Sequence, residues 1–293
     1  MRQLIGQDSI DVRFFAPPAD LAPCFTTFYR LEVDLPPGEV LEDWLQPEWA
    51  NLRFFAENAP TAEMPDGERV EGARFQATGP SSCPTHFTLG RTRMWGVGLF
   101  PLGWARFIGE DASAQANTVV DGERSPLFAR FAPLCGKLCT RAYSDEEQFA
   151  FLTAFFRKLA DPPRDQKRIQ RVHEVMVDPH LLQVEEFARK CGLSKRTLER
   201  VCARHFGFSP RLLLRRQRLM RSLAAYMLEP EASWSAVLDR HYHDQSHFVH
   251  EFHAFMRCSP SEYAAKPHPV MSAFMAERKR VWGSPAQTLD DPQ

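Results

Sequence analysis

The sequence has no hydrophobic run long enough to cross a lipid bilayer. Its longest apolar stretch, "MWGVGLFPLGWA" at residues 94–105, is short and is interrupted by glycine and proline. Residues 1–15 contain no apolar segment of signal-peptide length. Both absences argue against a membrane protein, and we expect a soluble, cytoplasmic protein with no membrane partner.

The chain also lacks the motifs of common enzyme and cofactor sites. It has no phosphate-binding glycine motif, and its seven scattered cysteines fit a reducing compartment better than a disulfide framework. Cys135 and Cys139 form a CxxxC motif, which is weak evidence for a redox or metal site. Residues 74–87, "RFQATGPSSCPTHF", bring Ser, Cys and His together without the context of a nucleophile elbow. We therefore expect no enzyme activity and no cofactor.

Charge is nearly balanced overall but unevenly distributed. The net charge is −1, yet residues 1–163 hold 15 Lys and Arg against 22 Asp and Glu, whereas residues 164–266 hold 18 against 12. A basic segment attached to an acidic one indicates that the second part meets a polyanion. A solvated basic surface is the alternative that charge alone leaves open.

Residues 1–163 are expected to form a β-rich α+β domain with a sensory or oligomerisation role. They hold 15 of the 23 prolines, with short aromatic and β-branched runs between them. The runs expected to be strands are 24–35, 50–55, 69–77, 85–100 and 105–109. Apolar residues at helical spacing predict a helix over 145–160, and "DPPRD" at 161–165 then predicts a linker.

Residues 164–266 are expected to form an all-α domain. Capping residues and glycines mark the helix ends. The expected boundaries are Gly192, Ser194, Gly207, Ser209–Pro210, Trp234, Asp244, Met256 and Ser259–Pro260. A long helix over 210–228 joins the two halves. The C-terminal tail, residues 267–293, is expected to be loosely ordered apart from residues 270–282.

A shift of fifty residues superposes the two halves of this helical segment. The matching pairs are Ser194 with Asp244, Leu198 with Phe248, Cys202 with Phe252, and Ser209–Pro210 with Ser259–Pro260. The helix cap, the two core positions and the start of the following helix therefore occur at the same places in both halves. The repeat predicts two similar units, each a short helix, a tight turn and a second capped helix, which is the helix-turn-helix plan.

In the first unit, one face of the second helix is apolar and the opposite face carries arginines. Leu198 and Cys202 lie on the apolar face, and Arg196, Arg200 and Arg204 lie opposite at intervals of four. Arginine suits bidentate contact with guanine and phosphate, so this face predicts contact with double-stranded DNA. A solvated helix face is the alternative.

In the second unit, five of the ten histidines fall within "HYHDQSHFVHEFH", residues 241–253. The interleaved phenylalanines form the apolar face, and the histidines lie outside it. Histidines spread this widely around one helix do not converge on one metal ion, and no Cys pair or Glu stands at ligand spacing. We expect no metal site. Gln245, near the helix N-terminus, is suited to reading adenine.

The residues "FARKCGLSKRTLERVCARHFGFSP" and "YHDQSHFVHEFHAFMRCSPSEY" resemble the DNA-binding domain of the AraC/XylS family of bacterial transcription regulators. The resemblance covers about 166–266 and implies two helix-turn-helix units that read successive major grooves. The positions that it places at the DNA are Lys195, Arg196, Thr197, Arg200, Arg204, His243, Asp244, Gln245 and His247.

The N-terminal part is similar to sensory domains of that family, through "PPADLAPCFTTFYRLE" and "WGVGLFPLGWARFIG". This similarity implies a signal-receiving role, and we expect a small-molecule effector, a homodimer, and contact with RNA polymerase if the protein is an activator. The alternative is a regulator without a ligand, controlled by a partner protein or by its abundance.

One departure from the family pattern concerns the turn of the second unit. The family has a glycine there, and "DRHYHDQ" (239–245) has none. A left-handed conformation at His241 or Tyr242 would cost stability, so the position of the second reading helix is in question.

Overall fold

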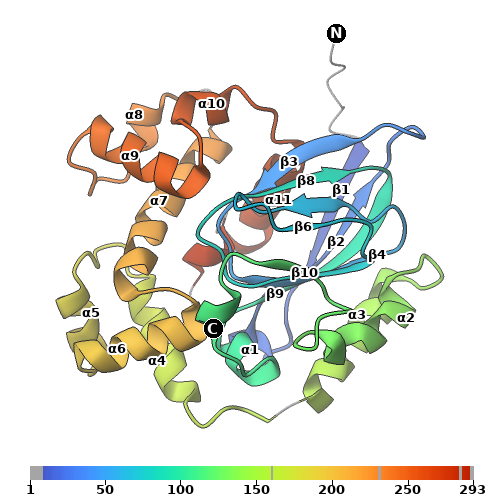
Figure 1. Cartoon of the computed structure of the whole chain (residues 1–293), viewed down its shortest axis with the longest axis horizontal. Helices are drawn as coiled ribbons and strands as arrows, with labels where there is room; N and C mark the ends of the chain where they lie inside the picture. The colour runs from blue at the N-terminus through green and yellow to red at the C-terminus, as the bar shows by residue number, and fades with distance from the viewer. Residues whose placement is uncertain (1–8, 160, 230–231, 284–285, 291–293) are drawn as a thin grey trace.

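A β-sandwich and a helical region form the two halves of the molecule (Figure 1). The computed structural model describes residues 9–159, 161–229, 232–283 and 286–290, so the first eight residues and the last three of the expected tail lie outside the described residues. Within the described part of the chain, no helix is long and apolar enough to span a membrane.

The sandwich consists of two antiparallel sheets. The six-stranded sheet has the order β1 (Ile10–Phe15), β2 (Phe25–Val33), β9 (Thr92–Leu99), β4 (Ala50–Phe55), β7 (Phe75–Thr78), β10 (Val119–Asp121). The four-stranded sheet has the order β3 (Leu41–Leu45), β8 (Thr85–Leu89), β5 (Thr61–Glu63), β6 (Arg69–Val70).

Side chains of the central strand β4 point alternately to the two faces of the large sheet. All six residues of β4 are buried: Leu52 and Phe54 point into the main apolar core, whereas Asn51 and Arg53 line a cavity on the other face. The ring of Tyr29 packs directly on the backbone of Gly96 in β9. A side chain at position 96 would prevent this, because a Cβ there would lie 1.9 Å from the ring carbon Cζ. The period of two in β4 thus separates core from cavity.

Four of the five expected strand segments are strands. Residues 69–77 and 85–100 each contain two strands instead of one. The fifth expectation, a strand at 105–109, is wrong, because residues Pro101–Phe107 form the helix α1. Pro101 begins that helix, and Trp104 and Phe107 are both buried at helical spacing. A short apolar run does not distinguish a strand from a buried helix.

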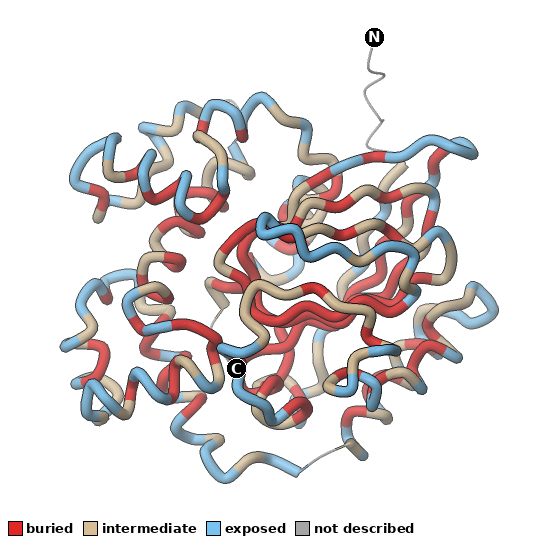
Figure 2. Tube along the Cα trace, in the orientation of Figure 1, coloured by how far each residue is buried: buried red, intermediate tan, exposed pale blue. Residues whose placement is uncertain are grey.

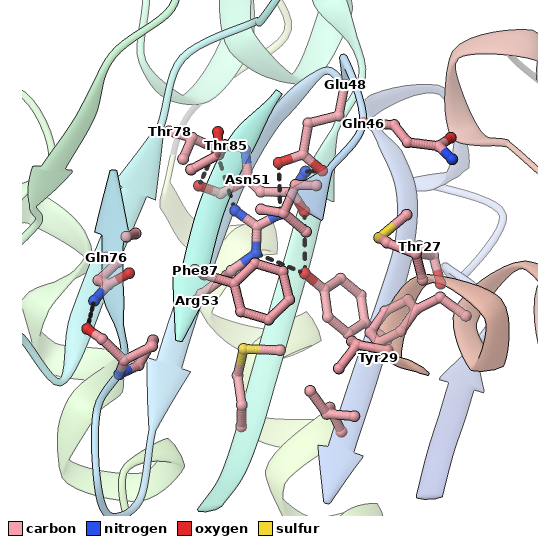
Figure 3. Close-up of a pocket in the computed structure, with 18 of the residues that line it drawn as sticks. Thr27, Tyr29, Gln46, Glu48, Asn51, Arg53, Gln76, Thr78, Thr85 and Phe87 are labelled. Carbon is pink, nitrogen blue, oxygen red and sulfur yellow. Dashed lines mark hydrogen bonds and ion pairs between the residues drawn. The ribbon is translucent and has the colours of Figure 1, made fainter. Parts of the chain in front are cut away.

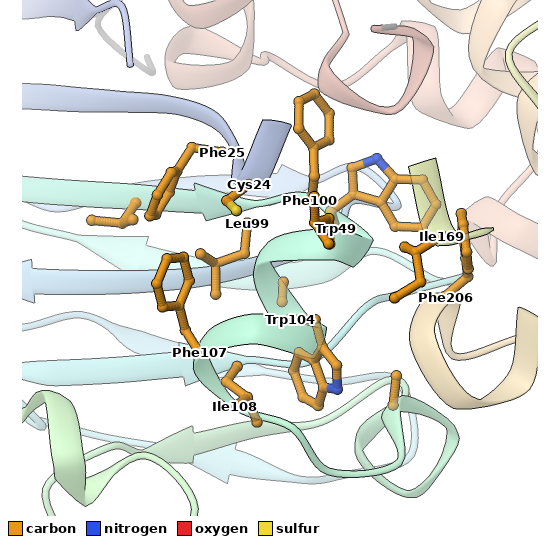
Figure 4. Close-up of a cluster of buried hydrophobic side chains, with 14 of the residues drawn as sticks. Cys24, Phe25, Trp49, Leu99, Phe100, Trp104, Phe107, Ile108, Ile169 and Phe206 are labelled. Atoms are coloured by element: carbon orange, nitrogen blue, oxygen red, sulfur yellow. The ribbon is translucent and has the colours of Figure 1, made fainter. Parts of the chain in front are cut away.

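The outer face of the large sheet packs against helices. The predicted helix at 145–160 is α3 (Asp145–Leu159), whose Phe156 meets Phe25 of β2 at a centroid distance of 4.8 Å. Figure 4 shows Trp104 and Phe107 of α1 in one apolar cluster with Ile169 and Phe206 of the helical region. The expected fold class, a β-rich domain followed by a helical one, is confirmed.

The helical region follows the predicted boundaries closely. Its elements are α4 (Gln166–Met176), α5 (Val184–Cys191), α6 (Lys195–Val201), a π-helical turn η5 (Cys202–Phe206), α7 (Pro210–Leu228), α8 (Trp234–Val237), α9 (Gln245–Met256) and α10 (Pro260–Ala264). Each of the four repeat positions caps a helix through its side chain: Ser194, Ser209, Asp244 and Ser259.

The C-terminal tail returns to the sandwich. Helix α11 (Pro269–Trp282) contains the residues expected to be ordered, and its Phe274 packs edge-on against Tyr29 of β2 at 5.0 Å. Asp43 of β3 fixes its start, since one carboxylate oxygen accepts the backbone N–H groups of Val270 and Met271, each at 2.9 Å. The expectation of loose order is wrong for residues 286–290, where Thr288 is fully buried.

The apolar core is continuous between the sandwich and the first helices of the helical region. One cluster of buried apolar residues has members in the strands and in α4 to α7, and Figure 2 shows buried residues in both parts. His173 of α4, for example, packs edge-on against Phe100 at 4.9 Å and Trp49 at 5.7 Å. The division at residues 163/164 therefore stays a prediction drawn from composition.

Candidate DNA-binding surface and effector cavity

The first helix-turn-helix unit consists of α5, a turn and α6. Gly192 ends α5 in the left-handed conformation with φ of 67°, and Ser194 then caps α6 by accepting the N–H of Thr197. Leu198 and Val201 are buried beneath α6. Arg196 and Arg200 are exposed on its outer face, and in the described part of the chain neither has an ion-pair partner.

Of the other three positions expected to meet DNA in this unit, Lys195 and Thr197 have partners within the protein, whereas Arg204 is exposed and has no ion-pair partner in the described part of the chain. Lys195 pairs with Glu185 of α5, and the hydroxyl of Thr197 lies 2.9 Å from the capping hydroxyl of Ser194. Arg204 lies near Asp111, the cap of η3 (Ala112–Gln115) in the sandwich half. A hydrogen bond from Ser113 lowers the pKa of Asp111, and the charge of Arg204 lowers it further.

The second unit makes its turn without a glycine and without a left-handed residue. Non-glycine residues with positive φ in the described ranges are Asn58, Asn117 and Arg257, so the expected strain at His241 or Tyr242 is absent. Instead, the carboxylate of Asp239 accepts the backbone N–H of His241 at 2.9 Å and its ring Nδ1 at 2.8 Å. A side-chain acceptor thus replaces the turn glycine.

Of the positions expected to read DNA in the second unit, His243 and Gln245 are exposed and do not cap a helix. Asp244 caps α9 by accepting the N–H of His247 at 2.7 Å. The ring of His247 lies 3.4 Å from Arg218 and stacks on that of His243, with centroids 5.9 Å apart. The stacked histidines flank the N-terminus of α9.

A buried carboxylate attaches α9 to the long helix α7. Glu251 is 2% exposed and forms ion pairs with Arg215 and Arg218, both at 2.8 Å. Burial opposes its ionisation, but the hydrogen bonds from Arg218 and Arg215 hold the pKa of Glu251 below its usual value. The two arginines lie 36 and 33 residues from Glu251 in the chain, so no local sequence pattern indicates the pairing.

Between the two sheets lies a cavity of about 120 Å³, which the sequence did not predict. Figure 3 shows its polar side chains, contributed by β2, β4, β7, β8 and the segment between β3 and β4. Sequence could have shown part of the signal, because polar residues alternate with apolar ones in strands otherwise suited to a core. Asn51 and Arg53 in β4, and Gln76 and Thr78 in β7, follow this pattern.

The C-terminal helices complete the cavity wall. Met220 comes from α7, the helix that joins the two helix-turn-helix units, and Met271, Phe274 and Met275 come from α11. Gln46 bridges the two halves, since its Nε2 donates to the hydroxyl of Tyr263 at 3.1 Å. The cavity is therefore lined by the sandwich and the helical region together.

Arg216 of α7 anchors that helix in the sandwich. It is fully buried, its guanidinium lies 3.9 Å from the ring centroid of Trp49, and Nη1 donates to the carbonyl of Ser81 at 2.9 Å. Burial lowers its pKa to about 9. A cation buried in this way couples the position of α7 to the strand ends around Trp49.

The family match among the comparisons with known proteins lies in the helical region. Residues 187–266 match the family described as a helix-turn-helix domain. No curated protein sequence matches the chain.

Among solved structures, ToxT from Vibrio cholerae is similar at 12% identity, with a TM-score of 0.46, over 87% of this chain and 98% of that one. ToxT with a bound unsaturated fatty acid is similar at 11% identity and a TM-score of 0.41, over 87% and 94%. The AraC-like transcriptional activator CuxR is similar at 13% identity and a TM-score of 0.30, over 73% and 86%. Similarities with these identities and TM-scores give no information about what this chain binds.

Proposed function

We propose that this chain is an AraC-type transcription regulator of the AraC/XylS family, on the helix-turn-helix match over residues 187–266, and that a small molecule bound in the sandwich cavity controls its binding to DNA. The observation that carries the proposal is the shared wall of the cavity. A molecule inside it touches Met220 on the helix between the two DNA-binding units. It also touches α11, which follows the second unit directly.

On the DNA side, we propose that Arg196 and Arg200 read bases from the first unit and Gln245 from the second. Exposure and the lack of an internal partner support the two arginines. Lys195, Thr197, Arg204, His243, Asp244 and His247 would then position the helices or contact phosphates. The two units would enter successive major grooves. A homodimer and a contact with RNA polymerase stay predictions, and we propose no catalytic role for any residue.

The test uses the full chain, because the cavity wall includes residues beyond 163. Selection from random DNA identifies the site, and fluorescence anisotropy then gives Kd with and without small molecules that raise Tm. We expect an effector to change the Kd for DNA by about fivefold or more, the range of ordinary allosteric coupling. Molecules that raise Tm but leave the Kd for DNA unchanged would favour the alternative, a regulator controlled by a partner protein or by abundance.

A further inference from the structure

The cavity contains two arginines, and each has a carboxylate partner. Nη2 of Arg53 lies 2.5 Å from a carboxylate oxygen of Glu48, and Arg278 of α11 pairs with Asp290. The remaining polar residues in the described wall are uncharged amides and hydroxyls, such as Gln46, Gln76 and Thr85. The charges of the cavity are therefore balanced before any ligand enters.

The pair of Arg53 and Glu48 is held by further hydrogen bonds (Figure 3). Nε of Arg53 donates to the hydroxyl of Tyr29 at 3.2 Å, and Asn51 donates to the other carboxylate oxygen of Glu48 at 2.9 Å. The two charged side chains are only 8% and 11% exposed. Burial opposes the charge on Arg53, but Glu48 and Tyr29 raise its pKa.

An anionic ligand that bound Arg53 would have to break this pair. A carboxylate that displaced Glu48 from Arg53 would leave Glu48 buried next to a second negative charge, and an uncompensated buried charge is strongly unfavourable. A neutral molecule leaves the pair intact. The arrangement therefore disfavours acids.

The rest of the wall suits a small apolar body with one polar end. Methionines at positions 94, 220, 271 and 275 provide flexible apolar walls. Two polar atoms of the described wall lack a partner, Nε of Arg278 and Oγ1 of Thr288, and both can donate to a hydroxyl or carbonyl oxygen. A dry cavity of roughly 150 Å³ holds benzene, which sets the size scale.

From this geometry we infer that the cavity selects an uncharged, largely apolar small molecule, and that Glu48 enforces the choice by keeping Arg53 ion-paired. The inference rests on the proposed function, because it names the ligand class of the same effector cavity. It makes Glu48 the specificity-determining residue.

The experiment compares neutral and acidic probes of matched shape on the full chain. The probes are benzyl alcohol with benzoate, and hexan-1-ol with hexanoate, at about pH 7.5, where both acids are ionised. Methyl-¹³C-methionine labelling reports binding in the cavity itself, because four methionines line it. Met176 in the main core serves as an internal reference. We expect each alcohol to shift the cavity methyl signals and each acid to bind at least tenfold more weakly.

The variant Glu48→Gln keeps the shape of the side chain and removes its charge. We expect it to reduce the preference for alcohol over acid at least tenfold. Glu123→Gln is the matched control, because Glu123 pairs with Arg74 at the surface at 2.7 Å, and its preference should equal that of the unmodified chain. The comparison in the unmodified chain stands even if Glu48→Gln does not fold.

The possible failures are distinguishable. Acids that bind as tightly as the alcohols, or more tightly, would overturn the inference and leave effector control intact. An unchanged preference in folded Glu48→Gln would overturn the role of Glu48. No methyl shift with any probe would overturn the inference together with the proposal that this cavity binds an effector.

Discussion

At the scale of single residues, buried charges and polar groups differ in how they are compensated. Glu251 is buried with two arginines, whereas Arg216 is buried against Trp49 with carbonyl partners. His173 lies beside Arg216 among aromatic rings, and its Nε2 has no partner within the described ranges. Arg196 and Arg200 on α6, in contrast, are exposed and carry no such cost, which is consistent with the proposal that they read bases.

For Arg200→Ala we predict a loss of about 1–3 kcal/mol in binding to the selected DNA site, with relaxed specificity at one base position, as for a base-contacting arginine. The measurement is anisotropy on the selected site and on single-base variants of it. Glu199→Ala, also exposed on α6, is the control. Equal weakening on every sequence would show that Arg200 contacts phosphate instead.

His173 predicts a pH dependence of stability. Burial, and then the charge of Arg216, lower its pKa to about 3. The unfolded chain takes up this proton near pH 6.5, whereas the folded chain does so only near pH 3. The contribution of His173 to the free energy of unfolding is therefore fully present above pH 6.5. Below that pH it falls by about 1.4 kcal/mol per pH unit.

Between pH 7 and pH 5, we expect the free energy of unfolding of the unmodified chain to fall by about 2 kcal/mol more than that of His173→Leu. Urea unfolding at both pH values measures the difference. His250→Leu, at an exposed position, should lose as much as the unmodified chain. Identical losses in His173→Leu and the unmodified chain would contradict a neutral, buried His173.

At the scale of elements, the two helix-turn-helix units reach similar geometry by different chemistry. The first turns at Gly192 and the second at the carboxylate of Asp239, which also pairs with Arg221 of α7. Glu251 adds a second connection between α9 and α7. The second unit therefore depends on α7 for its position, whereas the first shares the main core with the sandwich.

We predict that Asp239→Ala destabilises the second unit by about 1–3 kcal/mol, because it leaves the N–H of His241 and the guanidinium of Arg221 without their acceptor. Hydrogen exchange should become faster across 234–256 and stay unchanged in α6. Asp239→Asn, which keeps an acceptor oxygen, should retain most of the protection. Equal exchange in all three chains would contradict this account of the turn.

At the scale of the whole molecule, sandwich and helices behave as one packed body. Their shared core, the anchor at Arg216 and the return of α11 to β3 all join them. The cavity lies where these connections meet. Occupancy of the cavity is thus placed to change the relation of α7 and α11 to the sheets.

Filling the cavity tests this coupling without a ligand. Ala62 of β5 lines it and is 5% exposed, so Ala62→Leu should raise stability by about 1 kcal/mol and abolish probe binding. It should also change the Kd for DNA in the same direction as an effector does. Ala150→Leu on the exposed face of α3 is the control. A filled cavity with unaltered DNA affinity would contradict the coupling.

The sequence by itself determined the helix boundaries of the helix-turn-helix region and the strand positions of β2 and β4. Caps such as Ser194 and stops such as Gly192 act through hydrogen bonds within a few residues, and such chemistry is visible in a short window.

Only the tertiary structure decided the cavity, the closure by α11 and the pairing of Glu251. Each depends on groups far apart in the chain, as Arg216 and Ser81 are, 135 residues apart. The helix at Pro101–Phe107, expected as strand, belongs here too, because burial of Trp104 and Phe107 against distant partners selects the helix. Long-range packing leaves no local pattern from which it could be predicted.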